Sequence, residues 1–163
     1  MRRYGHVLVA GLLAGLAALA QAAGGGGGGP ASGSRPDAAT AVQERQLQAA
    51  LTAQDWPVAL ALLADLRRQQ PENADWWNWT GYAERKRGNL DAAFPAYYEA
   101  LRLNPAHLGA HEYLGEAYLQ AGQRELAEEQ LNELGRLCGE CREQQELAAA
   151  LRHDTPRPPE AAQ

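Results

Sequence analysis

The chain has 163 residues, the length of a single domain, and its formal net charge is −5. Nucleic acids and anionic lipid surfaces bind cationic proteins, so this charge argues against both as partners. Serine occurs only at Ser32 and Ser34, ahead of the predicted fold, and Walker-type and HExxH motifs are missing. We therefore expect a protein that is not an enzyme and has no cofactor.

Residues 1–22 have the order of a secretory signal. A basic start, MRRYGH, precedes an apolar run over residues 7–20 and the small-residue sequence Ala-Gln-Ala. The run is shorter than the roughly 20 residues of a membrane-spanning helix. We expect cleavage after Ala22, export to the bacterial periplasm, and no stable membrane insertion afterwards. An uncleaved N-terminal anchor is the alternative.

The predicted domain, residues 40–153, lies between two segments of different composition. Residues 23–39 contain six consecutive glycines, which cannot hold one conformation at low cost, so they predict a flexible linker. Residues 154–163 are rich in proline and are predicted to form a disordered tail.

Residues 40–153 read as helix throughout. Alanine, leucine, glutamate, glutamine and arginine dominate, and these are good helix formers. Helix-breaking residues recur at one fixed interval, as in the series Pro71, Pro105 and Gly139. This period, with two helices per unit, predicts an all-α solenoid of stacked helix–turn–helix units. The units are 40–73, 74–107 and 108–141, followed by a capping helix over 142–153.

Small residues recur with the same period. Gly81 and Gly115 occupy equivalent positions of successive units, and both are small where two helices are expected to cross closely. Bulky side chains such as Tyr97 should fill the space beside them. Pro95 falls inside the second helix of the middle unit, where it removes one backbone hydrogen bond and should bend that helix.

The middle unit, ADWWNWTGYAERKRGNLDAAFPAYYEALRLNPAH, resembles the tetratricopeptide repeat family, with Trp77, Gly81, Ala93, Tyr97 and Pro105 at the family's positions. The resemblance implies about three repeats with a C-terminal capping helix, acting as an interaction module or scaffold for a protein or peptide partner. Residues 111–116, His-Glu-Tyr-Leu-Gly-Glu, and the cysteine pair further resemble a group of small exported bacterial proteins of this family. Arg142 departs from that group, which has an acidic residue there.

In that family the first helix of each unit lines a concave groove that binds an extended peptide or a partner's helix. The matching groove residues here are Asn78, Tyr82, Arg85, Lys86, Glu112, Glu116 and Gln120, with Glu44 and Gln48 from the first unit. Arg85 and Lys86 could bind a partner carboxylate, and Asn78 the partner backbone. The alternative is that all are ordinary solvated side chains of helices.

Cys138 and Cys141 form a C-x-x-C pair in the predicted turn between the last unit and the cap. No strand is predicted nearby, unlike in thioredoxin-like proteins, and an exported protein favours a disulfide that fixes the cap. The alternative function is a periplasmic metal or thiol-redox accessory protein, with His107 and His111 as further metal ligands. Equivalent turns of stacked units lie about 10 Å apart, which argues against that metal set.

Overall fold

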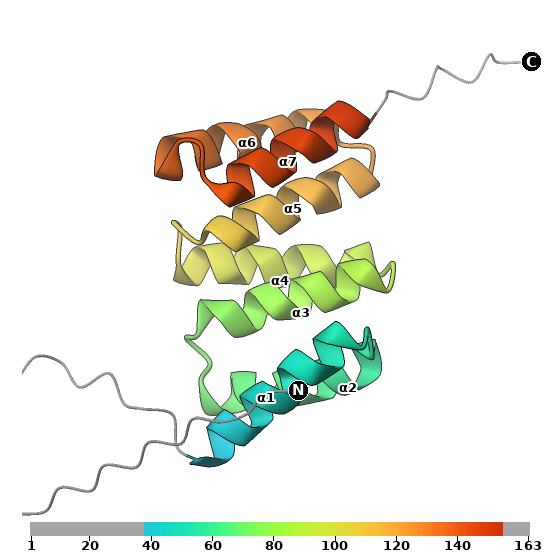
Figure 1. Ribbon diagram of the computed structural model, residues 1–163, viewed down its shortest axis with the longest axis vertical. Coiled ribbons are helices and arrows are strands. Elements are labelled where there is room, and N and C mark those ends of the chain that lie inside the picture. Colours follow the sequence, from blue (N-terminus) through green and yellow to red (C-terminus); the bar gives the residue numbers. More distant parts are fainter. Residues whose placement is uncertain (1–37, 155–163) are drawn as a thin grey trace, which may run out of the picture. The chain divides into compact units, whose positions relative to one another are not determined.

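The computed structural model describes residues 38–154, so the predicted signal, residues 23–37 of the linker and the tail after Asp154 lie outside the described part. Seven helices and no strand occur within it (Figure 1). The helices are α1 (Ala38–Thr52), α2 (Trp56–Gln69), α3 (Ala74–Lys86), α4 (Leu90–Leu103), α5 (Leu108–Gln120), α6 (Arg124–Cys138) and α7 (Arg142–His153). No helix among these residues has the length and apolar character needed to cross a membrane.

The helices pack as successive antiparallel pairs. α1 packs on α2, α3 on α4 and α5 on α6, while α2–α3, α4–α5 and α5–α7 contacts join one pair to the next. In Figure 1, α1, α3, α5 and α7 follow one another on the face turned to the viewer, with α2, α4 and α6 behind them. The predicted all-α solenoid of three helix pairs with a capping helix is therefore confirmed.

The turn inside each pair has the same backbone conformation. Gln54, Gly88 and Gly122 occupy equivalent positions of the three units and have φ angles of 56°, 85° and 72°. Glycine adopts this left-handed conformation without a steric penalty, whereas Gln54 adopts it as the one described non-glycine residue with positive φ. The sequence repeat therefore corresponds to a turn that recurs, with the same backbone conformation, within each helix pair.

Two glycines let large side chains fill the space between helices. A Cβ atom on Gly81 would lie 2.5 Å from the Tyr97 ring, and one on Gly115 would lie 2.5 Å from Leu147. Both Tyr97 and Leu147 are fully buried. Gly81 therefore sets the α3–α4 contact, and Gly115 sets the contact of the capping helix α7 with α5.

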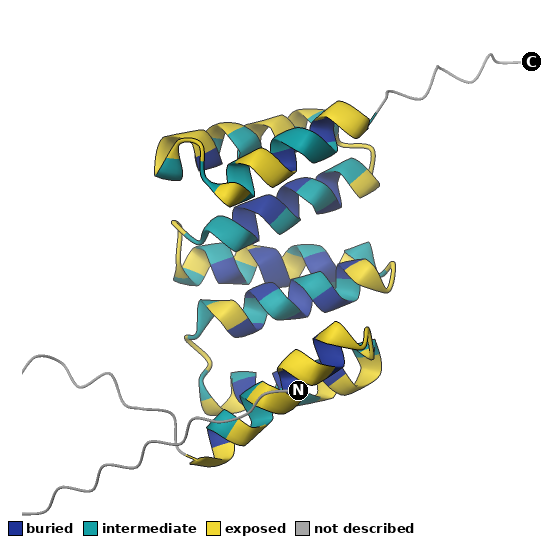
Figure 2. Cartoon of the chain, in the orientation of Figure 1, coloured by how far each residue is buried: buried dark blue, intermediate teal, exposed yellow. Residues whose placement is uncertain are grey.

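Buried apolar side chains form two clusters along the stack (Figure 2). The cluster on α1–α3 contains Leu47, Ala50, Leu51, Ala59, Leu63, Leu66 and Trp76. The cluster on α4–α7 contains Ala93, Tyr97, Leu114, Ala117, Tyr118, Ala127, Leu134, Leu147 and Leu151. α4 continues as one helix through Pro95, which is exposed, and the predicted bend there stays a prediction.

Replacing Gly81 by alanine tests the close approach. We expect Gly81→Ala to lower the free energy of unfolding by about 1–3 kcal/mol, because the added methyl group overpacks against the buried Tyr97 ring. Urea denaturation followed by circular dichroism measures this. Gly135→Ala is the matched control in helix α6, where an added Cβ meets nothing within 4 Å. It should raise stability by about 0.5–1 kcal/mol, and equal effects of the two changes would contradict the packing argument.

Candidate functional site

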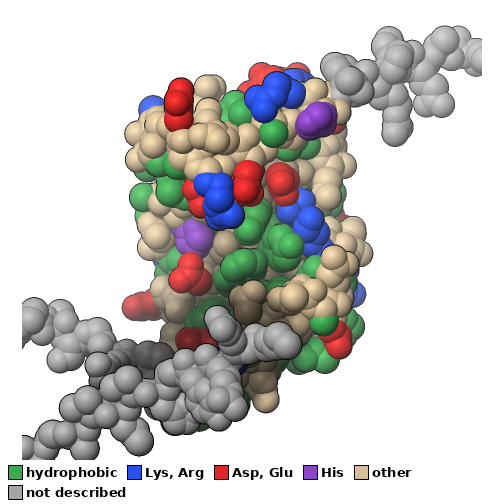
Figure 3. Space-filling view, in the orientation of Figure 1, with side chains coloured by type: hydrophobic (Ala, Val, Ile, Leu, Met, Phe, Trp, Pro, Cys, Tyr) green, Lys and Arg blue, Asp and Glu red, His purple; other side chains and the backbone are tan. Residues whose placement is uncertain are grey.

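The predicted groove residues of the second and third units lie on α3 and α5, the first helices of those pairs. Figure 3 shows this face with hydrophobic side chains gathered near its centre and charged side chains of both signs around them. The structure thus places these residues on the same side of the neighbouring helices α3 and α5, next to α7, where Asn78, Arg85 and Glu112 are buried.

Trp79, Tyr82 and Tyr113 lie on α3 and α5, and Trp56 at the start of α2 contacts Tyr82; we call these four rings the aromatic patch. Their centroids are 5.0–6.2 Å apart, with Tyr82–Tyr113 closest at 5.0 Å. All four side chains are half-buried, so each keeps some surface for a ligand. Sequence reasoning found only Tyr82. The signal for two others was present, because Trp79 and Tyr113 occupy equivalent positions of successive units.

Arg85 lies beneath these rings. Its guanidinium is 5.8 Å from the centroids of both Tyr82 and Tyr113, and it forms an ion pair with Glu116. The residue is only 4% exposed. Arg85 is therefore already paired with a carboxylate of this chain, whereas its neighbour Lys86 is exposed.

Lys86 is exposed and forms no ion pair with a described carboxylate. Its ammonium lies 5.4 Å from the Tyr82 ring. It borders a cavity of about 390 Å³ where the last turns of α3, α5 and α7 meet. The lining residues are Arg85, Lys86, Glu116, Leu119, Gln120, Ala150 and Asp154. Lys86 and the exposed Gln120 can thus offer donors to a bound chain.

Glu112 and Asn78 are buried polar residues of the same face, 3% and 4% exposed. Glu112 Oε2 and Asn78 Oδ1 accept no hydrogen bond from a donor among the described residues, and the protonated Glu112 carboxyl has the Glu146 carboxyl as its hydrogen-bonding neighbour. Burial raises the pKa of the Glu112 carboxyl to about 8, helped by the nearby carboxyls of Glu146 and Glu116. Glu112 is therefore mostly protonated at neutral pH, which differs from the charged groove residue that the sequence predicts.

The two histidines have structural partners. His107 caps the start of α5, where its Nδ1 accepts from the Ala110 amide at 3.1 Å, and its Nε2 lies 3.0 Å from Asp75 Oδ1. His111 bonds through Nδ1 to Gln130 at 2.8 Å, and its Nε2 lies 2.9 Å from the Pro105 carbonyl. Because a carbonyl only accepts, Nε2 of His111 is the donor.

Cys138 and Cys141 form a disulfide, as expected, across the turn that joins α6 to α7. Cys138 ends α6, Cys141 is the N-cap residue of α7, and Gly139 between them has a φ of 68°. No group of three or more histidine, cysteine or acidic residues able to hold a metal gathers within residues 38–154. The structure thus does not bring the cysteines and the two histidines together as a metal site.

The disulfide makes a testable contribution to stability. Replacing both cysteines, as Cys138→Ser with Cys141→Ser, should lower the free energy of unfolding by about 2 kcal/mol, the loop-entropy value for so short a ring. Urea denaturation of the oxidised wild type and the double variant measures it. No difference between them would mean that the packing of α7 alone holds the cap.

The pKa of Glu112 predicts how stability depends on pH. Its value in the fold, about 8, is raised above the usual 4.5, so the folded state binds more protons than the unfolded state between these values. Stability should therefore fall as pH rises from about 5 to about 8. Glu112→Gln should remove this slope and raise stability at pH 9 by roughly 1–3 kcal/mol. Glu125→Gln, an exposed change on α6, is the control, and an unchanged slope in Glu112→Gln would contradict the assignment.

Comparison of the sequence with models of known protein families identifies two matching models. A tetratricopeptide repeat family model matches residues 45–107, and a second one matches residues 84–152. No curated protein sequence matches the chain. The two matched ranges overlap and together run from within α1 to the last turn of α7, so they include the aromatic patch.

Solved structures agree with the family models. The Arabidopsis OM64 TPR domain is 16% identical, with a TM-score of 0.64 over 70% of this chain and 94% of that one. The TPR2B domain of yeast Sti1, solved in complex with pHsp70, is 18% identical, with a TM-score of 0.63 over 71% and 98%. The first TPR of Spaghetti (RPAP3), bound to the HSP90 peptide SRMEEVD, is 15% identical, with a TM-score of 0.61 over 69% and 95%. The chain therefore belongs to the tetratricopeptide repeat family, and its described part has that family's fold.

Proposed function

We propose that this protein is a non-enzymatic interaction module of the bacterial periplasm that binds an extended segment of a partner protein across α3, α5 and α7. The observation that carries this proposal is the aromatic patch, four half-buried rings in mutual contact on the groove face. The signal-like order of residues 1–22 supports export.

The chemistry of the face suits a peptide. Aromatic side chains dominate the energetics of protein interfaces, because they offer large apolar area with few rotatable bonds. Polar groups border the patch, with Lys86 and Gln120 exposed at the end formed by the last turns of the helices. A bound segment can therefore place apolar side chains on the rings and hydrogen-bond its backbone at the border.

Two of the similar structures support the same use of the fold. The yeast Sti1 domain was solved with pHsp70, and the Spaghetti domain with an HSP90 peptide. At 18% and 15% identity to this chain, they support a peptide-binding role and do not name the partner. Within the described residues, no contact beyond the disulfide itself favours the alternative of a metal or thiol-redox accessory protein.

Capture of partners from a periplasmic fraction tests the proposal. Immobilised wild-type protein should retain a partner that Tyr82→Ala loses by at least about tenfold, the effect of removing an aromatic residue central to an interface. Lys86→Glu should weaken the same capture. Arg136→Glu, an exposed charge reversal on α6, should leave capture unchanged.

The choice of variants follows from the structure. Arg85→Glu would put a second carboxylate against Glu116 in a buried site, which destabilises the fold and confounds the result. Circular dichroism should show that Tyr82→Ala and Lys86→Glu remain folded. Equal capture by wild type and both variants would contradict binding at this face.

A further inference from the structure

Carboxyl groups outnumber bases on the part of the groove formed by α5 and α7. Glu112 and Glu116 lie on α5, and Glu143 and Glu146 lie on α7. Two guanidinium groups face them, Arg85 from α3 and Arg142 from α7. We call Glu112, Glu116 and Glu146 the carboxyl cluster, because each of the other two acts on Glu112.

The ion pairs leave one member of this cluster without a base. Arg85 pairs with Glu116, and Arg142 divides itself between Glu143 at 3.0 Å and Glu146 at 3.6 Å. Glu112 forms no ion pair with a described base. The four carboxyls therefore have only two bases between them, so this region carries excess negative charge when all of them are ionised.

The unpaired carboxyl is also the buried one. Glu112 is 3% exposed, and its Oε2 atom accepts no hydrogen bond from a described donor, so its one hydrogen-bonding neighbour there is the Glu146 carboxyl, which also lacks a full positive partner. A buried carboxylate without a base is unfavourable, and proteins usually pair or protonate such a group. Glu112 is thus a buried carboxyl without a basic partner, on the face that we propose for partner binding.

We propose that the carboxyl cluster around Glu112 binds an arginine or lysine side chain of the partner segment. The inference rests on the proposed function, because it names the chemistry that the same face selects. Charge complementarity carries it, since a partner base supplies positive charge where four carboxyls have only two bases within the chain. Glu112 is then the residue that determines specificity.

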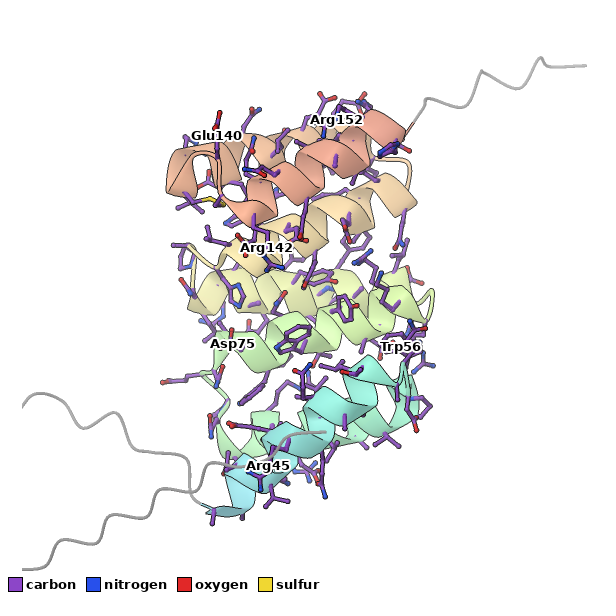
Figure 4. All side chains as sticks on the ribbon, in the orientation of Figure 1. Arg45, Trp56, Asp75, Glu140, Arg142 and Arg152 are labelled. Carbon is purple, nitrogen blue, oxygen red and sulfur yellow. A yellow bond between two sulfur atoms is a disulfide. The ribbon has the colours of Figure 1, made fainter. Side chains whose placement is uncertain are left out.

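Arg142, the base of this chain beside the carboxyl cluster, leaves room for a base from the partner. Figure 4 shows Arg142 at the start of α7, on the side of that helix towards α5. Its side chain is 70% exposed, and exposed ion pairs of this kind are weak, so Arg142 can shift at small cost to let a partner base add its charge beside Glu112. Tyr113 adjoins Glu112 in the sequence and belongs to the aromatic patch. The favoured partner therefore has apolar residues or prolines next to its base.

This site makes binding depend on pH. The pKa of Glu112 is affected by Glu116 on the same helix and by Glu146 and Arg142 on α7. Arg85 of α3 is also close, because it pairs with Glu116 and lies against the Tyr113 ring. A partner base binds the ionised form of Glu112, so binding releases a proton. Affinity should rise by up to about tenfold per pH unit below pH 8 and level off above it.

Selection of random linear peptides on the full-length chain at pH 8.5 tests the inference. We expect the selected peptides to share an arginine or lysine. Replacing a selected arginine by citrulline, which keeps the shape and loses the charge, should weaken binding at least about tenfold. Glu112→Gln should weaken binding to a similar extent at pH 9 and abolish its pH dependence, as measured by fluorescence polarisation between pH 6 and pH 9. Glu125→Gln should behave as wild type.

The outcomes separate this inference from the proposed function. If the selected peptides lack a base but still lose binding to the Tyr82→Ala variant, the inference of a basic partner is refuted. The proposal that the protein binds peptides at this face would remain supported. A selection that enriches no peptide would overturn both. Glu112→Gln mimics the protonated side chain, so an unchanged melting curve at pH 6 shows that it folds. Arg157 follows the last described residue and is a competing base within the chain. If Arg157→Gln strengthens peptide binding tenfold, Arg157 occupies the carboxyl cluster, and the proposal that a partner base binds there is wrong.

Discussion

The close contact between helices at Gly81 and Gly115 is the constraint on which the rest of the structure depends. Without a Cβ atom at these positions, the buried Tyr97 ring reaches across the α3–α4 pair, and Leu147 of the cap reaches α5. A single helix pair exposes too much apolar surface to be stable alone, so the pairs must stack, and these two contacts set how closely α4 approaches α3 and how closely the cap approaches α5. The groove face exists because α3, α5 and α7 are held side by side.

Electrostatics on that face follow from the same stacking. Arg85 and Glu116 come from neighbouring pairs and form an ion pair below the aromatic rings, which joins α3 to α5 near the C-terminal ends of these helices. The pair uses the charge that would otherwise serve a ligand. What stays available is Lys86 at one end and the unpaired Glu112 carboxyl at the other, so the face offers two different polar environments around one apolar centre.

Much of the fold could be predicted because its information is periodic. The series of Gln54, Gly88 and Gly122 marks one turn geometry, and the helix-forming composition between the turns leaves little choice of secondary structure. The C-x-x-C pair was also placed correctly, since its turn follows from the same register. The candidate site was harder. Register places residues on the first helix of each pair, but it does not say which of them are covered by neighbours, and Arg85 and Glu112, predicted to line a groove, are buried.

The sequence by itself determined the all-α class, the number of helix pairs and the capping helix. These depend on local propensity and on a repeated spacing, which are both properties of the chain read in order. Only the tertiary structure decided the partners of individual side chains: the Arg85–Glu116 pair, the cluster that raises the pKa of Glu112, and the contact of Trp56 with Tyr82. The physical reason is that burial and pairing arise between helices, where the relative positions of residues distant in sequence set the local charge and solvation.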